Sequence, residues 1–276
     1  MTRACCIGWP IEHVRSPIIH NHWLKTMGIA GAYTREGVRP EHFATFFRGL
    51  AEQGFAGCNV TLPHKETAFA LLDEVDPAAM AVGAVNTVWL DGGKLVGMNS
   101  DVPGFIANLD EEAPGWDRTS AHAVVIGAGG AARGIVYGLI ERGVEIITLA
   151  NRSTGKAELI ARQYPGRVRV AGLDDLPSAL ATCDLLVNTT SLGMAGQPPL
   201  AVDLDHMKPG AIVSDIVYAP LVTDLLRQAA ERGHPTVGGL GMLLHQAVPG
   251  FERWFGVRPT VTRALYDLVA ADIGAH

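Results

Sequence analysis

Apolar and polar positions follow two different patterns along this chain. In the first hundred residues, short apolar runs alternate with stretches that place apolar side chains at helical spacing. The short runs predict strands at residues 4–8, 55–60, 84–89 and 94–97, the last two joined by an Asp-Gly-Gly turn at 91–93. The helical stretches predict helices at 16–27, 41–53 and from the end of a loop at 61–65 through residue 72. Ser16 is expected to be the N-cap of the first helix, with Pro17 in its first turn.

A regular succession of buried strands and helices begins at His122. Strands are expected at 123–126, 144–150, 185–187, 211–215 and 236–237, and helices at 131–142, 222–232, 242–254 and 260–271. Continuous apolar strands separated by helices pair in parallel and are buried on both faces. The pattern therefore predicts an α/β protein in which an N-terminal α/β domain precedes a Rossmann-like parallel sheet. Residues 111–120 are interpreted as a surface linker.

Composition argues against several classes of protein. The 276 residues are 48% hydrophobic and 18% charged, so the chain can bury a core and is not disordered. A net charge of -6 without a long basic run argues against nucleic acid or an anionic membrane surface as a partner. No stretch approaches the ~20 apolar residues of a membrane span, and no signal region is evident, so a cytoplasmic protein is expected. Cysteine and histidine spacing predicts no metal site, and buried reduced thiols are expected at Cys5, Cys6, Cys58 and Cys183.

A glycine-rich turn between a predicted strand and a predicted helix carries the first chemical signal. The sequence GAGGAA at 127–132 stands where a dinucleotide-binding fingerprint requires it. Gly127 would permit the tight turn and Gly129 would let the backbone approach the pyrophosphate. The first helical residues, Gly130 and Ala131, would offer N–H groups to the phosphates.

The end of the next strand indicates which nicotinamide cofactor binds. NAD enzymes usually carry Asp or Glu there for the ribose 2′-hydroxyl. This chain has Asn151, Arg152 and Ser153, with Lys156 just beyond. Two cations and two small polar groups suit a 2′-phosphate, which an acid would repel. The expected cofactor is NADP.

A series of short sequences, read in order over nearly the whole chain, resembles the shikimate dehydrogenase family. Besides the glycine turn and the NRS at 151–153, the sequences are GWPIEHVRSP (8–17), NVTLPHK (59–65), GAVNT (83–87), GMNSD (97–101), NTTSLGM (188–194), DIVYAP (215–220) and GLGMLLHQ (239–246). Two positions depart from the usual family pattern. Val14 stands where a second serine is common, and Ser100 stands where threonine is usual.

The resemblance implies an NADP-dependent oxidoreductase that reversibly reduces 3-dehydroshikimate to shikimate in aromatic amino-acid biosynthesis. It implies a substrate-binding and catalytic domain at 1–103, an NADP-binding domain at 104–238 and C-terminal helices at 239–276 that return to the first domain. The active site would lie in the cleft between the domains. The sequence leaves a monomer and a homodimer equally open.

The resemblance also assigns residues. Lys65 and Asp101 would be the catalytic pair that handles the proton. The substrate contacts it implies are Ser16, Thr61, Asn86, Tyr218 and Gln246. Further cofactor contacts are expected at Thr189, Gly239 and Met242, with Gly239 letting the backbone approach the nicotinamide.

Two other interpretations fit the same sequence. A quinate/shikimate or aminoshikimate dehydrogenase would use this scaffold with a changed ring pocket. A nucleotide-sensing relative would keep the fold without turnover, although retention of both Lys65 and Asp101 argues against it.

Overall fold

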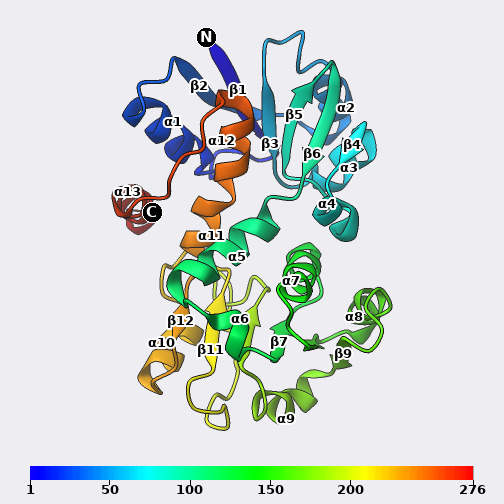
Figure 1. Cartoon of the computed structure of the whole chain (residues 1–276), viewed down its shortest axis with the longest axis vertical. Coiled ribbons are helices and arrows are strands. Elements are labelled where there is room, and N and C mark those ends of the chain that lie inside the picture. The colour runs from blue at the N-terminus through cyan, green and yellow to red at the C-terminus, as the bar shows by residue number, and fades with distance from the viewer. Residues whose placement is uncertain (276) are drawn as a thin grey trace. The chain divides into compact units, whose positions relative to one another are not determined.

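The computed structural model describes residues 1–275, which form two compact units (Figure 1). The first unit contains Met1–Gly104 and Leu244–Val269. The second contains Phe105–Leu243 and the residues from Ala270 onward. The domain boundaries expected from the sequence, after residues 103 and 238, stay predictions.

The first unit is built on a six-stranded mixed sheet of order β2-β1-β3-β5-β6-β4. Strand β1 is parallel to β2 and β3, whereas β5 is antiparallel to β3 and β6. The carboxyl ends of β1, β3 and β6 therefore reach the same edge as the amino end of β5. The strands are β1 (Thr2–Gly8), β2 (Gly31–Gly37), β3 (Gly57–Val60), β4 (Glu74–Val75), β5 (Thr87–Asp91) and β6 (Lys94–Met98). The helices of this unit are α1 (Ser16–Thr26), α2 (Pro40–Arg48), α3 (Lys65–Leu71), α4 (Pro77–Val82) and α12 (Ala247–Phe255).

Both faces of this sheet are covered, as the uninterrupted apolar run of β1 requires. Alternate side chains of a strand point to opposite faces. Cys5 and Ile7 accordingly pack in one cluster with apolar side chains of α2, while Ala4 and Cys6 pack in another with Trp254 of α12.

The second unit is built on a six-stranded, wholly parallel sheet of order β12-β11-β10-β7-β8-β9. Its strands are β7 (His122–Ile126), β8 (Ile146–Ala150), β9 (Val168–Ala171), β10 (Leu185–Asn188), β11 (Ile212–Asp215) and β12 (Thr236–Val237). Its helices are α6 (Trp116–Thr119), α7 (Gly130–Glu141), α8 (Thr154–Ala161), the 3-10 turn η1 (Leu173–Asp175), α9 (Leu176–Leu180) and α10 (Asp224–Glu231). Helices α5 (Asp101–Glu112), α11 (Gly239–His245) and α13 (Arg263–Gly274) contain residues of both units.

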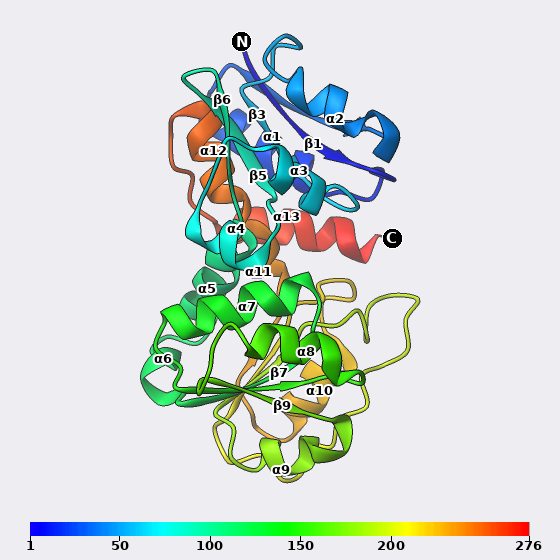
Figure 2. The same ribbon diagram turned by 90° about the vertical axis from the view of Figure 1, so that its right-hand side faces the viewer.

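Helices cover both faces of the parallel sheet. Figure 2 shows α7 and α8 on one side and α9 on the other, and the alternating burial of β7 agrees with this. Ala123 and Val125 pack with side chains of α7, whereas Val124 and Ile126 pack with those of α9 and α10. The predicted α/β class with a Rossmann-like parallel sheet is thus confirmed.

The predicted hairpin is also confirmed. Strands β5 and β6 are antiparallel, and Asp91 pairs with Lys94 across a two-residue loop. Gly92 and Gly93 both have positive φ, 55° and 83°, as the type of turn that matches strand twist demands.

Three local predictions were wrong. The N-cap of α1 is Arg15, and Ser16 is already the first helical residue. The helix predicted at 41–53 ends at Arg48, because the chain leaves helical geometry at Gly49 and turns through Gly54 with φ 79°. The supposed linker at 111–120 is largely helical.

Trp116 explains the error in the linker. Its polar surroundings suggest a solvated loop, yet its ring lies in the core of the second unit. The indole Nε1 donates a hydrogen bond of 2.9 Å to Asp110, which satisfies its one polar group.

In residues 1–275, no helix is long and apolar enough to span a membrane.

Candidate active site

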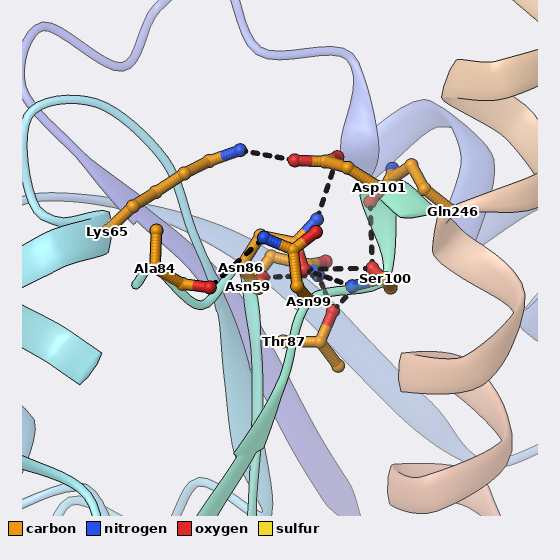
Figure 3. Close-up of polar contacts among 9 residues, drawn as sticks. All are labelled: Asn59, Lys65, Ala84, Asn86, Thr87, Asn99, Ser100, Asp101 and Gln246. Atoms are coloured by element: carbon orange, nitrogen blue, oxygen red, sulfur yellow. Dashed lines mark hydrogen bonds and ion pairs between the residues drawn. The ribbon is translucent and has the colours of Figure 1, made fainter. Parts of the chain in front are cut away.

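The edge where β1, β3 and β6 end and β5 begins gathers polar side chains from four separate segments. Lys65 is the first residue of α3, after the short turn that follows β3. Asp101 is the first residue of α5, shortly after β6. Lys65 Nζ lies 2.7 Å from Asp101 Oδ2, and the two side chains are 27% and 30% exposed (Figure 3). An ammonium and a carboxylate are therefore held together at a surface that a ligand can reach.

Asn86 fixes the other oxygen of that carboxylate. Its Nδ2 donates to Asp101 Oδ1 at 2.8 Å. Its Oδ1 accepts from the backbone N–H and the hydroxyl of Ser100, at 2.7 and 3.0 Å. Because Asn86 is almost fully buried, the orientation of Asp101 is set from inside the protein.

The turn before Lys65 is anchored to β1 and closed by a hydrogen bond of its own. The Thr61 N–H donates to the Ile7 carbonyl at 2.9 Å, and the His64 N–H donates to the Thr61 carbonyl at 3.0 Å. The ring of His64 stacks on Phe43 and its Nε2 lies 2.7 Å from the Val38 carbonyl. Burial lowers the pKa of His64, which keeps this neighbour of Lys65 neutral.

Ser16 and Gln246 also belong to the first unit. Ser16, at the start of α1, is 6% exposed, and Gln246, between α11 and α12, is 8% exposed. Gln246 Oε1 lies 3.5 Å from the Ser100 hydroxyl. This approach requires glycine at position 104, since a Cβ there would lie 2.8 Å from the Gln246 backbone nitrogen.

The glycine-rich turn lies between β7 and α7 in the second unit. Helix α7 begins at Gly130, one residue before the predicted start at 131. Gly127 has φ 110°, and a Cβ on it would lie 2.5 Å from Thr189 Oγ1. The Thr189 hydroxyl itself donates to the Ile126 carbonyl at 2.7 Å. At Gly129 and Gly130 a Cβ would meet open space instead, so the start of α7 is open beside these two residues.

Sheet order explains why Gly127 and Thr189 meet. Strands β8 and β9 add to one side of β7. The chain then crosses to the other side, where β10 pairs with β7, so the order of the strands reverses at the boundary between β7 and β10. Ligands of open α/β sheets bind at the carboxyl ends of strands beside such a reversal.

The turn after β8 is exposed and carries two cationic side chains. Asn151 Nδ2 donates to the Ser153 carbonyl at 2.7 Å and shapes the turn. Arg152, Ser153 and Lys156 are all exposed, and no acidic residue occupies the turn itself.

Three further predicted residues also lie in the second unit. Gly239 is a place of close backbone packing: a Cβ there would lie 2.2 Å from the Ile216 carbonyl oxygen. Met242 packs against the core cluster that contains side chains of β7 and α7, and Tyr218 is half-buried.

Within residues 1–275, no group of three His, Cys, Asp or Glu side chains is placed to hold a metal ion.

Asn59, Thr87 and Ser100 lie within the motifs described above, but no role is predicted for them. All three are buried, and they form one hydrogen-bonded group with Asn86. The sequence did hold a signal: Asn59 is the single polar residue of the otherwise apolar strand β3. A buried amide needs hydrogen-bond partners, so Asn59 pointed to further polar residues nearby.

Comparison with known proteins identifies the family. Residues 6–88 match the model of the shikimate dehydrogenase substrate binding domain, residues 111–195 that of shikimate / quinate 5-dehydrogenase, and residues 239–262 that of the shikimate 5′-dehydrogenase C-terminal domain. The shikimate dehydrogenase (NADP(+)) of Azorhizobium caulinodans is 52% identical over 275 residues, which cover 100% of this chain and 98% of that protein. The chain belongs to the shikimate dehydrogenase family.

Solved structures of shikimate dehydrogenase family members have the same fold. Shikimate 5-dehydrogenase from Thermus thermophilus, in complex with NADP(H) and shikimate, is 32% identical with a TM-score of 0.85, covering 99% of this chain and 100% of that one. Quinate dehydrogenase of Corynebacterium glutamicum, in complex with NAD, is 31% identical with a TM-score of 0.90, covering 98% and 99%. Both substrate classes therefore occur on this fold.

Proposed function

We propose that this chain catalyses the NADP-dependent, reversible reduction of 3-dehydroshikimate to shikimate. The observation that carries the proposal is the Lys65–Asp101 pair, held at 2.7 Å and oriented by Asn86. The 52% identity to an NADP(+) shikimate dehydrogenase over the whole chain supports the same reaction and cofactor.

The second unit fits NADP at two places. Open space above Gly129 and Gly130 would admit a pyrophosphate to the start of α7, where N–H groups and the helix dipole favour anions. Arg152, Ser153 and Lys156 would hold the 2′-phosphate. The bound nicotinamide supplies or accepts the hydride.

The residues of the first unit would handle the proton. In the direction of reduction, the Lys65 ammonium donates a proton to the oxygen that becomes the hydroxyl group. Asp101 holds the ammonium in position with one oxygen and accepts from Asn86 with the other. Ser16, Thr61 and Gln246 would contact the ring substituents. Tyr218, a residue of the second unit, stays a predicted substrate contact.

Steady-state kinetics with four combinations of substrate and cofactor test the proposal. The purified chain should reduce NADP⁺ with shikimate, as measured by the absorbance of the reduced nicotinamide. It should act far less efficiently with quinate or with NAD⁺. A higher kcat/KM for quinate would move the chain to the alternative dehydrogenase class. No turnover of either compound would favour the nucleotide-sensing alternative. We also propose that the enzyme is cytoplasmic. It would act as a monomer or a homodimer, and analytical sedimentation would distinguish these two states.

A further inference from the structure

A chain of buried hydrogen bonds leads from the interior of the first unit to the catalytic pair. Tyr33 OH lies 2.5 Å from Asn59 Oδ1, and Asn59 Nδ2 lies 3.0 Å from Thr87 Oγ1. The Thr87 and Ser100 hydroxyls are 2.8 Å apart. Ser100 bonds to Asn86, and Asn86 bonds to Asp101 (Figure 3). The chain thus passes from β2 through β3 and β5 to the start of α5.

The direction of the amide bonds follows from which atoms can only donate or only accept. The Ser100 backbone N–H must donate, so the Asn86 atom facing it is oxygen, and the Asn86 nitrogen faces the Asp101 carboxylate. The Asn86 backbone carbonyl must accept, so the Asn59 atom facing it is nitrogen. Asn59 oxygen then faces Tyr33, whose hydroxyl is the donor.

The hydroxyl protons follow from the amides. Thr87 Oγ1 accepts from Asn59, so its own proton is available for Ser100. The Ser100 proton is thereby directed to Asn86 Oδ1 at 3.0 Å, with Gln246 Oε1 as the longer alternative at 3.5 Å. Every proton of the chain points toward the carboxylate, and Lys65 donates to that carboxylate from the other side.

We propose that Thr87 and Tyr33 are positioning residues of the active site, which act through this one-way chain to hold Asn86 and Asp101 in the orientation that Lys65 needs. This inference rests on the proposed function. Thr87 is fully buried and Tyr33 is 3% exposed, so both would act through other residues. Thr87 is the central link, because it is the donor that leaves the Ser100 proton for Asn86.

The packing around Tyr33 suits a fixed role. The ring of His20 stacks on it at 4.1 Å, and Trp254 lies at 5.8 Å. These contacts hold the ring while its hydroxyl holds Asn59. Burial raises the pKa of the Tyr33 hydroxyl, so the hydroxyl keeps the proton that it donates to Asn59.

A matched pair of variants at position 87 tests the proposal. Thr87→Val keeps the shape but can neither accept from Asn59 nor donate to Ser100, whereas Thr87→Ser keeps the hydroxyl. We expect Thr87→Val to lower kcat for shikimate oxidation about tenfold, the value of one or two hydrogen bonds. Thr87→Ser should stay within about twofold of the parent, and neither variant should change the KM for NADP⁺. Tyr33→Phe should lower kcat by a smaller factor and add little to Thr87→Val, because both break one chain.

Trp23→Phe controls for lost stability in the same unit. It removes the partly buried hydrogen bond of 3.1 Å from Trp23 Nε1 to the Thr260 carbonyl and leaves every residue of the hydrogen-bond chain in place. Its kcat should equal that of the parent even if its melting temperature falls as far as that of Thr87→Val. Wild-type kcat in Thr87→Val, equal losses in Thr87→Val and Thr87→Ser, or an equal loss in Trp23→Phe would each overturn the proposal.

A different result would count against the proposed function alone. If the parent protein turns over neither shikimate nor quinate, the proposed reaction fails. The NMR signal of the Asn86 side-chain amide then tests the chain independently of turnover. It should shift in Thr87→Val and stay unchanged in Thr87→Ser; no shift in Thr87→Val would overturn the proposal.

Discussion

At the scale of single residues, the role that we propose for the Lys65–Asp101 pair is in proton transfer, and its exposure leaves it little part in stability. Both side chains are close to 30% exposed, and such ion pairs contribute about 0–1 kcal/mol to folding. We therefore expect Lys65→Ala to lower kcat by roughly 10²–10⁴, the usual value of a positioned acid or base, with little change in melting temperature. Lys94→Ala, which breaks the exposed pair with Glu74, is the control and should leave kcat unchanged. Near-wild-type kcat in Lys65→Ala would remove Lys65 from the mechanism.

Arg152 is expected to discriminate between the two nicotinamide cofactors. It is exposed in the turn after β8, where a 2′-phosphate would meet it. Arg152→Ala should weaken NADPH binding by about 1.5–3 kcal/mol, the value of a hydrogen bond to a charged group, and NADH binding much less. Titration of both cofactors by fluorescence or calorimetry measures this. Arg162→Ala, at the end of α8, should change neither affinity. Equal losses for both cofactors would show that Arg152 does not contact the phosphate.

Val14 is the position where the family resemblance leads us to expect a second serine. Its side chain packs with the cluster of Tyr33 and Trp254, and its carbonyl accepts two bonds from Arg35, at 2.7 and 3.0 Å. Val14→Ser supplies a hydroxyl for the substrate carboxylate, so the KM for shikimate should fall about tenfold or more, with kcat within a few fold. Val14→Ala loses the same packing without the hydroxyl and should not lower KM. An unchanged KM in Val14→Ser, with lost activity on quinate, would indicate a different substrate.

At the scale of elements, the glycine turn before α7 separates a folding requirement from a binding requirement. Gly127 has φ 110° and no room for a Cβ beside Thr189, whereas Gly129 has φ -88° and open space. Gly127→Ala should therefore destabilise the protein by about 1–3 kcal/mol in urea unfolding. Gly129→Ala should fold normally yet bind NADPH more weakly, since the pyrophosphate would use that space. The reverse pattern of stability and affinity would contradict the assignment.

The same elements show how far sequence patterns reach. The continuous apolar strands and the glycine turn of the second unit were predictable, because burial on both faces leaves an unmistakable run. Strand β2 was not, because it carries three consecutive polar residues, the half-buried Thr34 and Glu36 and the exposed Arg35, and only its pairing with β1 makes it a strand. The pairs within β5 and β6 were predictable from the local turn, whereas sheet order is decided by contacts far apart in sequence.

At the scale of the whole molecule, sheet order is what assembles the proposed site. Lys65, Asn86 and Asp101 come together because β5 runs antiparallel between β3 and β6. No local pattern contains that arrangement, so the sequence alone could assign these residues only by resemblance. The buried links behind them, Thr87 and Asn59, were within reach only as unexplained polar residues at strand positions.

The unfolding free energy of the whole protein depends on pH, and buried histidines with a lowered pKa contribute to that dependence. Burial lowers the pKa of His20 to about 3, and its two ring nitrogens lack a hydrogen-bond partner among the described residues. Between about pH 6.5 and about pH 3, the unfolded chain binds a proton that the folded His20 excludes. The stability that depends on a neutral His20 is therefore complete above about pH 6.5 and is lost as the pH falls. Burial also lowers the pKa of His64 and His122, which adds to the loss of stability. Burial raises the pKa of the half-buried Asp76 and the buried Asp215, and these carboxyls therefore gain stability as the pH falls.

His20→Phe isolates this contribution. Phenylalanine keeps a ring stacked on Tyr33 and removes a buried polar group without a partner, so the variant should be at least as stable as the parent at about pH 7. From about pH 7.5 to about pH 5, the parent should lose about 2 kcal/mol more unfolding free energy than the variant, the linkage value for one histidine that stays neutral. Urea titrations of both proteins at the two pH values measure the difference, and His22→Phe, at a more exposed position on the same helix, is the control. Parallel losses in the parent and in His20→Phe would show that His20 is not held neutral by the fold.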